Sequence, residues 1–232
     1  MTTWANSSKH AVAALTPPVR RTRLLPTAAA LLLVLLLGAG ALYAGTMGFR
    51  VVSTEQGRRL DIAATPRTLP PAALYAANGQ RQPGTLARAF GDDPRIAIVA
   101  FIYTTCNAVC SVLGSEFQQM QQALKDQGLQ DRVRLVSISF DPRDTPDALA
   151  AYAKRMQADP ASWQFVAMSD DAERAAVLER FGIVVLPAPL GEFQHNAAFH
   201  LVDRQGRLAR VIDFAAPQQA LATAIALGKE PL

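Results

Sequence analysis

The hydrophobic and polar positions divide the chain into one long apolar run and a following region of shorter, alternating patterns. Residues 24–49 carry no charge, and this run is long enough to cross a bilayer as a helix. Three arginines between residues 20 and 23 precede it, so the positive-inside rule keeps the basic segment 1–23 cytoplasmic and exports the rest of the chain. A cleavable signal peptide and an organelle transit sequence are alternatives to this transmembrane anchor. All three place the main domain outside the cytosol.

Residues 50–70 predict a tether, because prolines and scattered charges interrupt any sustained apolar period. Residues 71–232 then alternate between short apolar runs and segments of helical period, which predicts an α/β sandwich with a mixed central sheet. The order suggests a thioredoxin-like plan without excluding other α/β folds. Strands are predicted at 73–76, 96–103, 133–140 and 163–168. Helices are predicted at 85–90 and 111–127, from Pro146 onward, and from Asp170 or Asp171 to Phe181. A hairpin with strands at 197–202 and 208–214 and a helix at 217–227 close the domain.

The helix predicted at residues 111–127 begins directly after the second of two cysteines. Gly128 is expected to end it, because glycine readily adopts the left-handed conformation that closes helices. The positions expected to face the core are Val112, Phe117, Met120 and Leu124.

Composition and charge narrow the class of protein. Half of the 232 residues are hydrophobic, which is enough for one ordinary domain with a real core and an anchor. The net charge of +4 consists of +5 in the first fifty residues, which hold five basic residues and no acid, and −1 in the remainder, which holds 18 basic and 19 acidic residues. The main domain therefore has no basic excess, and nucleic-acid binding is not indicated.

The two cysteines, Cys106 and Cys110, lie where a predicted buried strand passes into a helix. Backbone N–H groups and the helix dipole favour thiolates there. A structural disulfide is one interpretation in an oxidising compartment, but so short a loop gains little from closure. Positions four apart on a helix hold their Cβ atoms about 5–6 Å apart, whereas a disulfide needs about 3.5–4.5 Å. The spacing therefore suits chelation of a soft ion such as Cu(I) or zinc, and a redox dithiol remains an alternative.

A metal site needs a third ligand, and the chain has three histidines. His10 lies in the segment that is cytoplasmic or removed. His200 is in the middle of the strand at 197–202, where a histidine is usually part of the packing. His195 follows a proline-rich loop at 186–192 that we expect to be mobile and able to bring the ring to a metal. Imidazole suits copper and zinc alike, so the residue types alone leave His195 open as a ligand.

Three segments of the chain together resemble the Sco/SenC family of copper-handling and thiol-redox domains tethered beside respiratory membranes. They are YTTCNAVC at 103–110, SFDPRDTP at 139–146, and His195 with the hairpin that comes after it. The second segment is the feature that ordinary thioredoxins lack. The resemblance covers roughly residues 74–227, includes the N-terminal anchor, and implies a thioredoxin-like fold.

The resemblance also implies a site. Cys106 and Cys110 would supply two thiolate ligands to copper, as Cu(I) and also as Cu(II), and His195 would supply one imidazole. Asp141 and Asp144 would stand behind these ligands or contact a partner.

The chain departs from the family pattern at several positions. Asn107 and Ser111 stand where many members have prolines, and Gln194 stands where an acidic residue is common. His200 takes the place of a usual aromatic residue, so the resemblance does not make it a ligand. These departures leave the three ligands intact but put metal affinity, and membership in the oxidase-assembly branch, in doubt.

The resemblance implies a copper chaperone, not an enzyme, which gives its ion by ligand exchange to the cytochrome c oxidase subunit with the binuclear copper centre, or to another copper or thiol client. A thiol-disulfide oxidoreductase with Cys106 and Cys110 as its redox pair is the alternative. A thiol peroxidase is disfavoured, because no suitable arginine lies near the cysteines. We expect a single-pass protein of a bacterial inner membrane with its domain in the periplasm; the alternatives are the mitochondrial inner membrane and secretion after signal cleavage.

Overall fold

The structure, a computed structural model, describes residues 24–46, 48, 53–81, 85–106 and 109–229 of a chain that divides into two units. The first unit, Met1–Val52, contains helix α1 (Leu24–Gly45). Within α1, Pro26–Gly45 is long and apolar enough to span a membrane. The second unit, Ser53–Leu232, contains the sheet and the candidate site.

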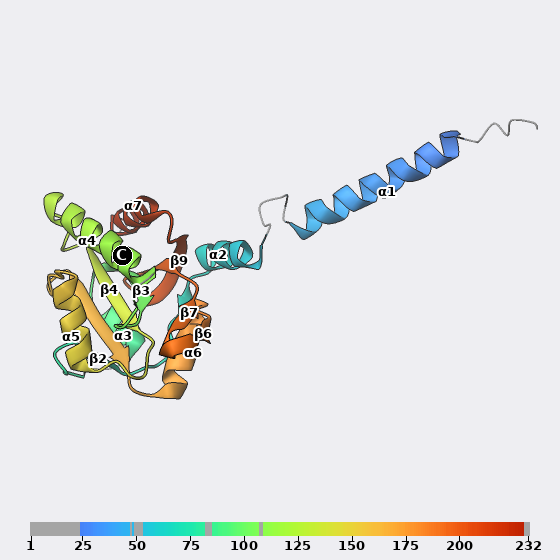
Figure 1. Cartoon of the computed structure of the whole chain (residues 1–232). Coiled ribbons are helices and arrows are strands. Elements are labelled where there is room, and N and C mark those ends of the chain that lie inside the picture. The colour runs from blue at the N-terminus through green and yellow to red at the C-terminus, as the bar shows by residue number, and fades with distance from the viewer. Residues whose placement is uncertain (1–23, 47, 49–52, 82–84, 107–108, 230–232) are drawn as a thin grey trace, which may run out of the picture. The chain divides into compact units, whose positions relative to one another are not determined.

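A seven-stranded mixed sheet forms the centre of the second unit, with the strand order β1-β9-β8-β3-β4-β5-β2 (Figure 1). Its central strands β3 (Ile96–Ile102), β4 (Val133–Ser139) and β5 (Trp163–Met168) are parallel. All residues of β3 and β4 are buried, as expected for strands covered on both faces. The antiparallel strands are β1 (Arg67–Thr68), β2 (Leu74–Ala76), β8 (Ala198–Val202) and β9 (Arg207–Asp213).

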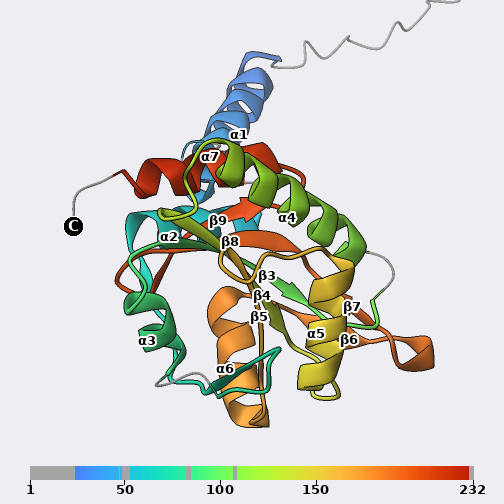
Figure 2. The same ribbon diagram turned by 90° about the vertical axis from the view of Figure 1, so that its left-hand side faces the viewer.

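Helices cover both faces of this sheet, which confirms the predicted α/β sandwich. On one face, Phe117 stacks against Phe199 at 5.9 Å between ring centroids, and the two longest helices of this face lie side by side (Figure 2). On the other face, Phe181 contacts Phe101 at 5.1 Å. The first face carries α4 (Val109–Asp126), α5 (Pro146–Arg155) and α7 (Pro217–Leu227), and the second carries α2 (Thr54–Ala64), α3 (Leu86–Gly91) and α6 (Asp171–Phe181).

The tether predicted for residues 50–70 is replaced, over its described part, by α2 and β1. Ile62 of α2 is fully buried, and β1 pairs with β9 at the edge of the sheet. Arg58 donates to the carbonyl oxygen of Phe181 at 3.0 Å, and Arg59 lies 3.3 Å from the carboxylate of Asp213. The prediction was wrong because one apolar side chain and a few ionic contacts, instead of an apolar stripe, hold this helix.

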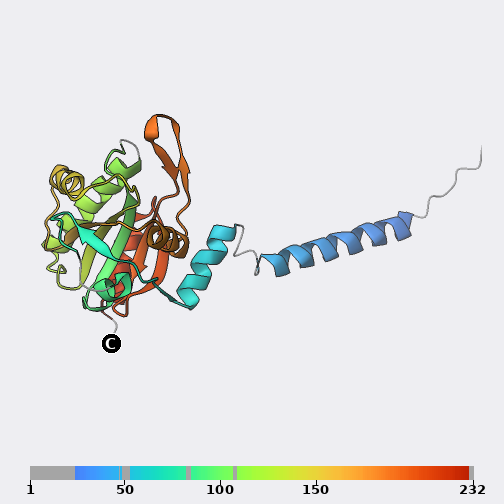
Figure 3. The same ribbon diagram turned by 90° about the horizontal axis from the view of Figure 1, so that it is seen from below.

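Two further expectations need correction. Val112 of α4 is 50 % exposed and Leu113 is buried in its place, whereas Phe117, Met120 and Leu124 are buried as predicted. The proline-rich loop before His195 is also more regular than expected, because β6 (Val185–Pro187) and β7 (Phe193–His195) form a separate two-stranded sheet. This hairpin, orange in Figure 3, projects from the body of the second unit.

Candidate metal centre

Three segments meet beyond the carboxyl ends of β3 and β4. The first leaves β3 through Tyr103 and Cys106, the second leaves β4 through Phe140, and the third is β7, which ends in His195. The carboxyl ends of neighbouring parallel strands lie at one edge of a sheet, and ligand sites of α/β proteins gather there. The ring of Phe140 lies 5.4 Å from that of Tyr103 and 4.9 Å from that of His195. The fold therefore brings the cysteine motif and His195 to the same place.

The cysteines lie at the predicted strand-to-helix junction. Cys106 is 3 % exposed, and its backbone N–H donates to the carbonyl oxygen of Tyr103 at 3.3 Å. Cys110 lies in the first turn of α4, where the N–H groups of a helix start favour a thiolate. Its side chain is outside the described part of the structure, so the structure places this residue by its helix alone.

Asp144 fixes the loop that leads to Cys106. Its carboxylate accepts hydrogen bonds from the N–H of Thr104 at 2.9 Å, the hydroxyl of Thr104 at 2.5 Å and the hydroxyl of Ser139 at 2.5 Å. Asp144 is 5 % exposed, so its carboxylate faces the protein. It ties the loop after β3 to the loop after β4, two residues before Cys106.

Asp141 has a related role on the neighbouring loop. Its carboxylate is buried and accepts from the backbone N–H and the guanidinium of Arg143, with distances between 2.7 and 3.0 Å. Held in this way, Arg143 donates to the carbonyl oxygen of Gly191 at 2.8 Å and lies over the ring of Phe193 at 5.1 Å. Asp141 and Asp144 thus both support the loops around the site, and neither carboxylate lies on the surface.

His195 is presented to Cys106 in a form that suits a metal ligand. Its Nδ1 lies 3.0 Å from the carbonyl oxygen of Asn196, which can only accept, so Nδ1 carries the proton and Nε2 carries the lone pair. The pKa of His195 is lowered, because burial outweighs the hydrogen bond to Asn196 and the charge of the Cys106 thiolate, both of which raise it. The ring of His195 also lies 6.3 Å from that of Tyr103. His195 therefore lies beside the motif that contains Cys106.

His200 is a packing residue, as its place in a strand suggested. It is 1 % exposed, its Nε2 lies 3.1 Å from the carbonyl oxygen of Phe181, and its ring meets Phe101 and Phe181 edge-on at 5.8 and 5.3 Å. Burial and, to a smaller extent, the charge of Arg58 lower its pKa to about 4 against the opposing effect of the hydrogen bonds. His200 therefore stays neutral and enclosed within the sandwich.

The residue types gave no signal for one contact of the site. The hydroxyl of Tyr103 donates to Oε2 of Glu192 at 2.6 Å and accepts from the N–H of Phe193 at 3.4 Å. Burial, the bond to Glu192 and the adjacent Cys106 thiol raise the pKa of Tyr103, so the phenol remains protonated. Tyr103 belongs to the recognised cysteine motif, but no pattern in the sequence pairs it with a residue 89 positions away.

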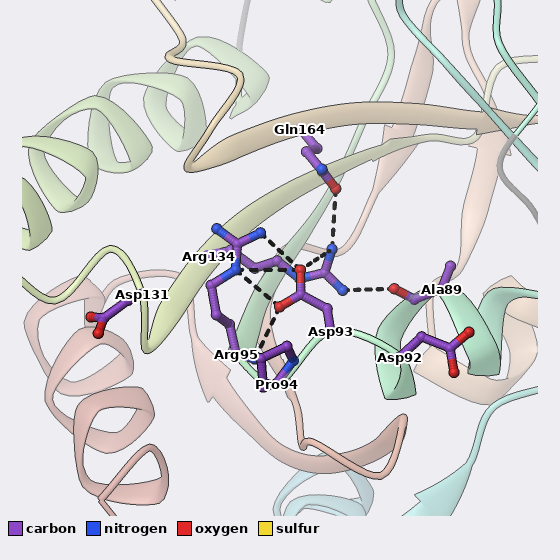
Figure 4. Close-up of a pocket in the computed structure, with 8 residues that line it drawn as sticks. All are labelled: Ala89, Asp92, Asp93, Pro94, Arg95, Asp131, Arg134 and Gln164. Carbon is purple, nitrogen blue, oxygen red and sulfur yellow. Dashed lines mark hydrogen bonds and ion pairs between the residues drawn. The ribbon is translucent and has the colours of Figure 1, made fainter.

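A cavity of about 570 Å³ lies at the opposite end of β3, β4 and β5 (Figure 4). Three of its charged side chains bind one another, since Asp93 accepts from Arg95 at 2.8 and 2.9 Å and lies 3.3 Å from Arg134. No cysteine or histidine lines it, so it offers no ligand to a soft metal. Among the side chains that the structure describes, no three of Cys, His, Asp and Glu gather as metal ligands. Cys110 is outside that set.

Comparison with known proteins finds relatives from one family, one of which was solved with copper bound. The SCO1/SenC family model matches residues 85–227. A SCO1 protein homolog of Bacillus subtilis (strain 168) is 27 % identical over 117 residues, 47 % of this chain and 58 % of the relative, so the chain spans little more than half of that protein. Bradyrhizobium japonicum ScoI, solved with copper bound, is 26 % identical with a TM-score of 0.56, covering 69 % of this chain and 99 % of that one.

A third relative is similar in fold. BsSco, described as a member of the Sco family of cytochrome c oxidase assembly proteins that has a disulfide switch, is 19 % identical with a TM-score of 0.59. The alignment covers 72 % of this chain and 96 % of that one. The sheet and helices described above therefore form the thioredoxin-like fold of these proteins, as the order of elements suggested.

Proposed function

Because the chain belongs to the SCO1/SenC family, we propose that it is a membrane-anchored copper carrier that binds one copper ion through Cys106, Cys110 and His195. The observation that carries this proposal is the position of the His195 ring beside Tyr103 and Phe140, which brings β7 to the loop that carries Cys106. Copper is the cargo of this protein. Two thiolates and one imidazole are soft or intermediate donors that suit Cu(I) and exclude calcium and magnesium.

The ligand set explains how the ion could be both held and released. Three donors leave one side of Cu(I) open, so the ligands of an acceptor can attack the ion and displace those of the carrier. Such an exchange needs no turnover chemistry. His195 is neutral at physiological pH because burial lowers its pKa, so no proton has to leave the ring before copper binds.

The proposed acceptor is the binuclear copper centre of cytochrome c oxidase. The description of BsSco as a member of a family of oxidase assembly proteins supports this assignment. The apolar helix α1 would hold the carrier on the membrane that contains the oxidase. We place the anchor in a bacterial inner membrane and the second unit in the periplasm, because the basic residues precede α1.

A thiol-disulfide oxidoreductase is the second candidate, favoured by the position of both cysteines at a helix start and by the disulfide switch of BsSco. In this role the two thiols would lose two electrons and two protons to a client disulfide and close into a disulfide themselves. A disulfide offers no thiolate to copper. The two roles are therefore exclusive at any one moment.

Titration of the reduced, full-length protein in detergent with Cu(I) tests the proposal. We expect one copper per chain, and none at this affinity in a Cys106→Ser, Cys110→Ser double variant. His195→Ala should weaken copper binding and leave disulfide exchange intact, whereas His200→Phe, a matched histidine control, should change neither. Unchanged stoichiometry in the double variant would remove copper binding from this site, and normal affinity in His195→Ala would favour the redox role.

A further inference from the structure

The hairpin formed by β6 and β7 carries His195 without belonging to the seven-stranded sheet. Its base is fixed by Asn196, which donates to the carbonyl oxygen of Gly182 at 2.8 Å and accepts from the N–H of Val184 at 2.7 Å. The remainder projects from the body (Figure 3). Leu190, in the turn between β6 and β7, is fully exposed. The distance between His195 and Cys106 therefore depends on side-chain contacts between this arm and the body.

Three side chains of the body make those contacts, and all leave from the loops that build the site. The ring of Phe140 lies 5.6 Å from that of Phe193 and 4.9 Å from that of His195. The hydroxyl of Tyr103 binds the carboxylate of Glu192 at 2.6 Å and the N–H of Phe193 at 3.4 Å. Arg143 reaches the carbonyl oxygen of Gly191 at 2.8 Å and covers the ring of Phe193. The Tyr103 hydroxyl and the Cys106 thiol are also neighbours. One phenol thus connects the loop of the first cysteine to the strand of the histidine.

We propose that the Tyr103–Glu192 hydrogen bond, backed by Arg143, is a latch that holds hairpin β6–β7 closed over Cys106, and that its opening withdraws His195 when copper passes to an acceptor. The copper part of this inference rests on the proposed function. Side-chain contacts and the base at Asn196, in place of strand pairing with the seven-stranded sheet, join the arm to the body. The arm therefore belongs to the parts of a protein that open locally without global unfolding. Tyr103 and Glu192 act through His195 and are positioning residues.

The expected ratio of closed to open hairpin follows from the charge of Glu192. A hydrogen bond to a charged group favours the closed form by about 10- to 100-fold over the open form. Tyr103→Phe removes the donor and keeps the ring that contacts Phe140 and Phe193. Glu192→Ala removes the acceptor from a half-buried position on the arm, and Glu192→Gln keeps an oxygen that can still accept from the phenol.

Hydrogen–deuterium exchange of the reduced, metal-free, full-length protein in detergent tests the latch without copper. In Tyr103→Phe and Glu192→Ala we expect about tenfold or faster exchange in the peptide that spans residues 184–196. Glu192→Gln, which keeps an acceptor but loses the charge, should give an exchange rate between those of the wild type and Glu192→Ala. The control is Tyr152→Phe, the same change at another buried tyrosine in α5, which should leave this peptide unchanged. Exchange at the wild-type rate in both Tyr103→Phe and Glu192→Ala would overturn the proposal. If Tyr103→Phe does not fold, the result for Glu192→Ala alone decides.

Transfer of Cu(I) from each loaded variant to a chromophoric chelator tests the link to release. Tyr103→Phe and Glu192→Ala should transfer copper about tenfold faster than the wild type. Tyr152→Phe should stay close to the wild type, and Glu192→Gln should lie between the wild type and Glu192→Ala. Faster exchange of the hairpin with unchanged copper transfer would overturn the release role of the latch alone. A Cys106→Ser, Cys110→Ser variant that binds copper as well as the wild type does would overturn the proposed function instead. The two failures are therefore distinct.

Discussion

His200 makes the stability of the second unit depend on pH between about 4 and 6.5. Its ring is buried between Phe101 and Phe181, and burial lowers its pKa to about 4 from an ordinary value of 6.5. In that range the unfolded chain binds a proton that the folded chain excludes, so the free energy of unfolding falls as the pH falls. One pH unit corresponds to about 1.4 kcal/mol. The difference between the pKa values of His200 in the unfolded and the folded chain therefore contributes about 3 kcal/mol to the free energy of unfolding. This contribution is present above pH 6.5 and lost by pH 4.

His200→Phe isolates this contribution, because phenylalanine does not titrate and keeps a ring at the same place. The variant loses the hydrogen bond to the carbonyl oxygen of Phe181, so at pH 8 it should be about 1 kcal/mol less stable than the wild type. Urea unfolding of residues 53–232, a fragment that keeps all of α2, monitored by tryptophan fluorescence between pH 4 and 8, measures the difference. We expect the difference in the free energy of unfolding between the two proteins to change by about 3 kcal/mol in favour of the variant between pH 8 and pH 4. A difference that stays constant over this range would refute the reasoning.

Three further substitutions test the support of the fold and the site. Asp144→Asn should destabilise the second unit by about 2 kcal/mol and weaken copper binding, because its new amide would face the hydrogen-bond donors of Thr104; thermal melting and Cu(I) titration measure the two effects. Ile62→Ala should cost about 2–4 kcal/mol in urea unfolding of residues 53–232, whereas a silent substitution would show that α2 does not pack there. Gly206→Ala should lower the melting temperature strongly, since φ is +69° and a new Cβ would meet the carbonyl oxygen of Ala87; a melting temperature like that of the wild type would contradict this.

The elements with the strongest sequence patterns were predicted correctly. The apolar runs of β3 and β4 form strands buried on both faces, and Asp170 caps α6 as expected, accepting from the N–H of Glu173 at 2.8 Å. These patterns are local, and they produce a buried strand or a capped helix in any compact α/β fold. The elements that were missed depend on distant contacts. Ion pairs and one buried isoleucine hold α2, and strands of three residues beside Pro187 and Pro189 are too short to produce an alternating pattern.

In the candidate site, too, local features could be predicted and contacts between distant segments could not. Cys106 and His195 could be selected by residue type, since few soft donors exist in the chain, and the structure brings His195 to the motif that contains Cys106. The support of Asp144 for the cysteine loop and the contact of Tyr103 with Glu192 could not be predicted, because each joins segments far apart in sequence. The carboxylates of Asp141 and Asp144 are buried, which favours the supporting role over contact with a partner.

X-ray absorption at the copper edge of the reduced, full-length protein loaded with one equivalent of Cu(I) tests the central claim most directly. The account predicts two sulfur neighbours and one nitrogen neighbour, with the nitrogen lost in His195→Ala and both sulfurs lost in the Cys106→Ser, Cys110→Ser variant. A spectrum that is the same in the wild type and in these variants would contradict the assignment of copper to this site.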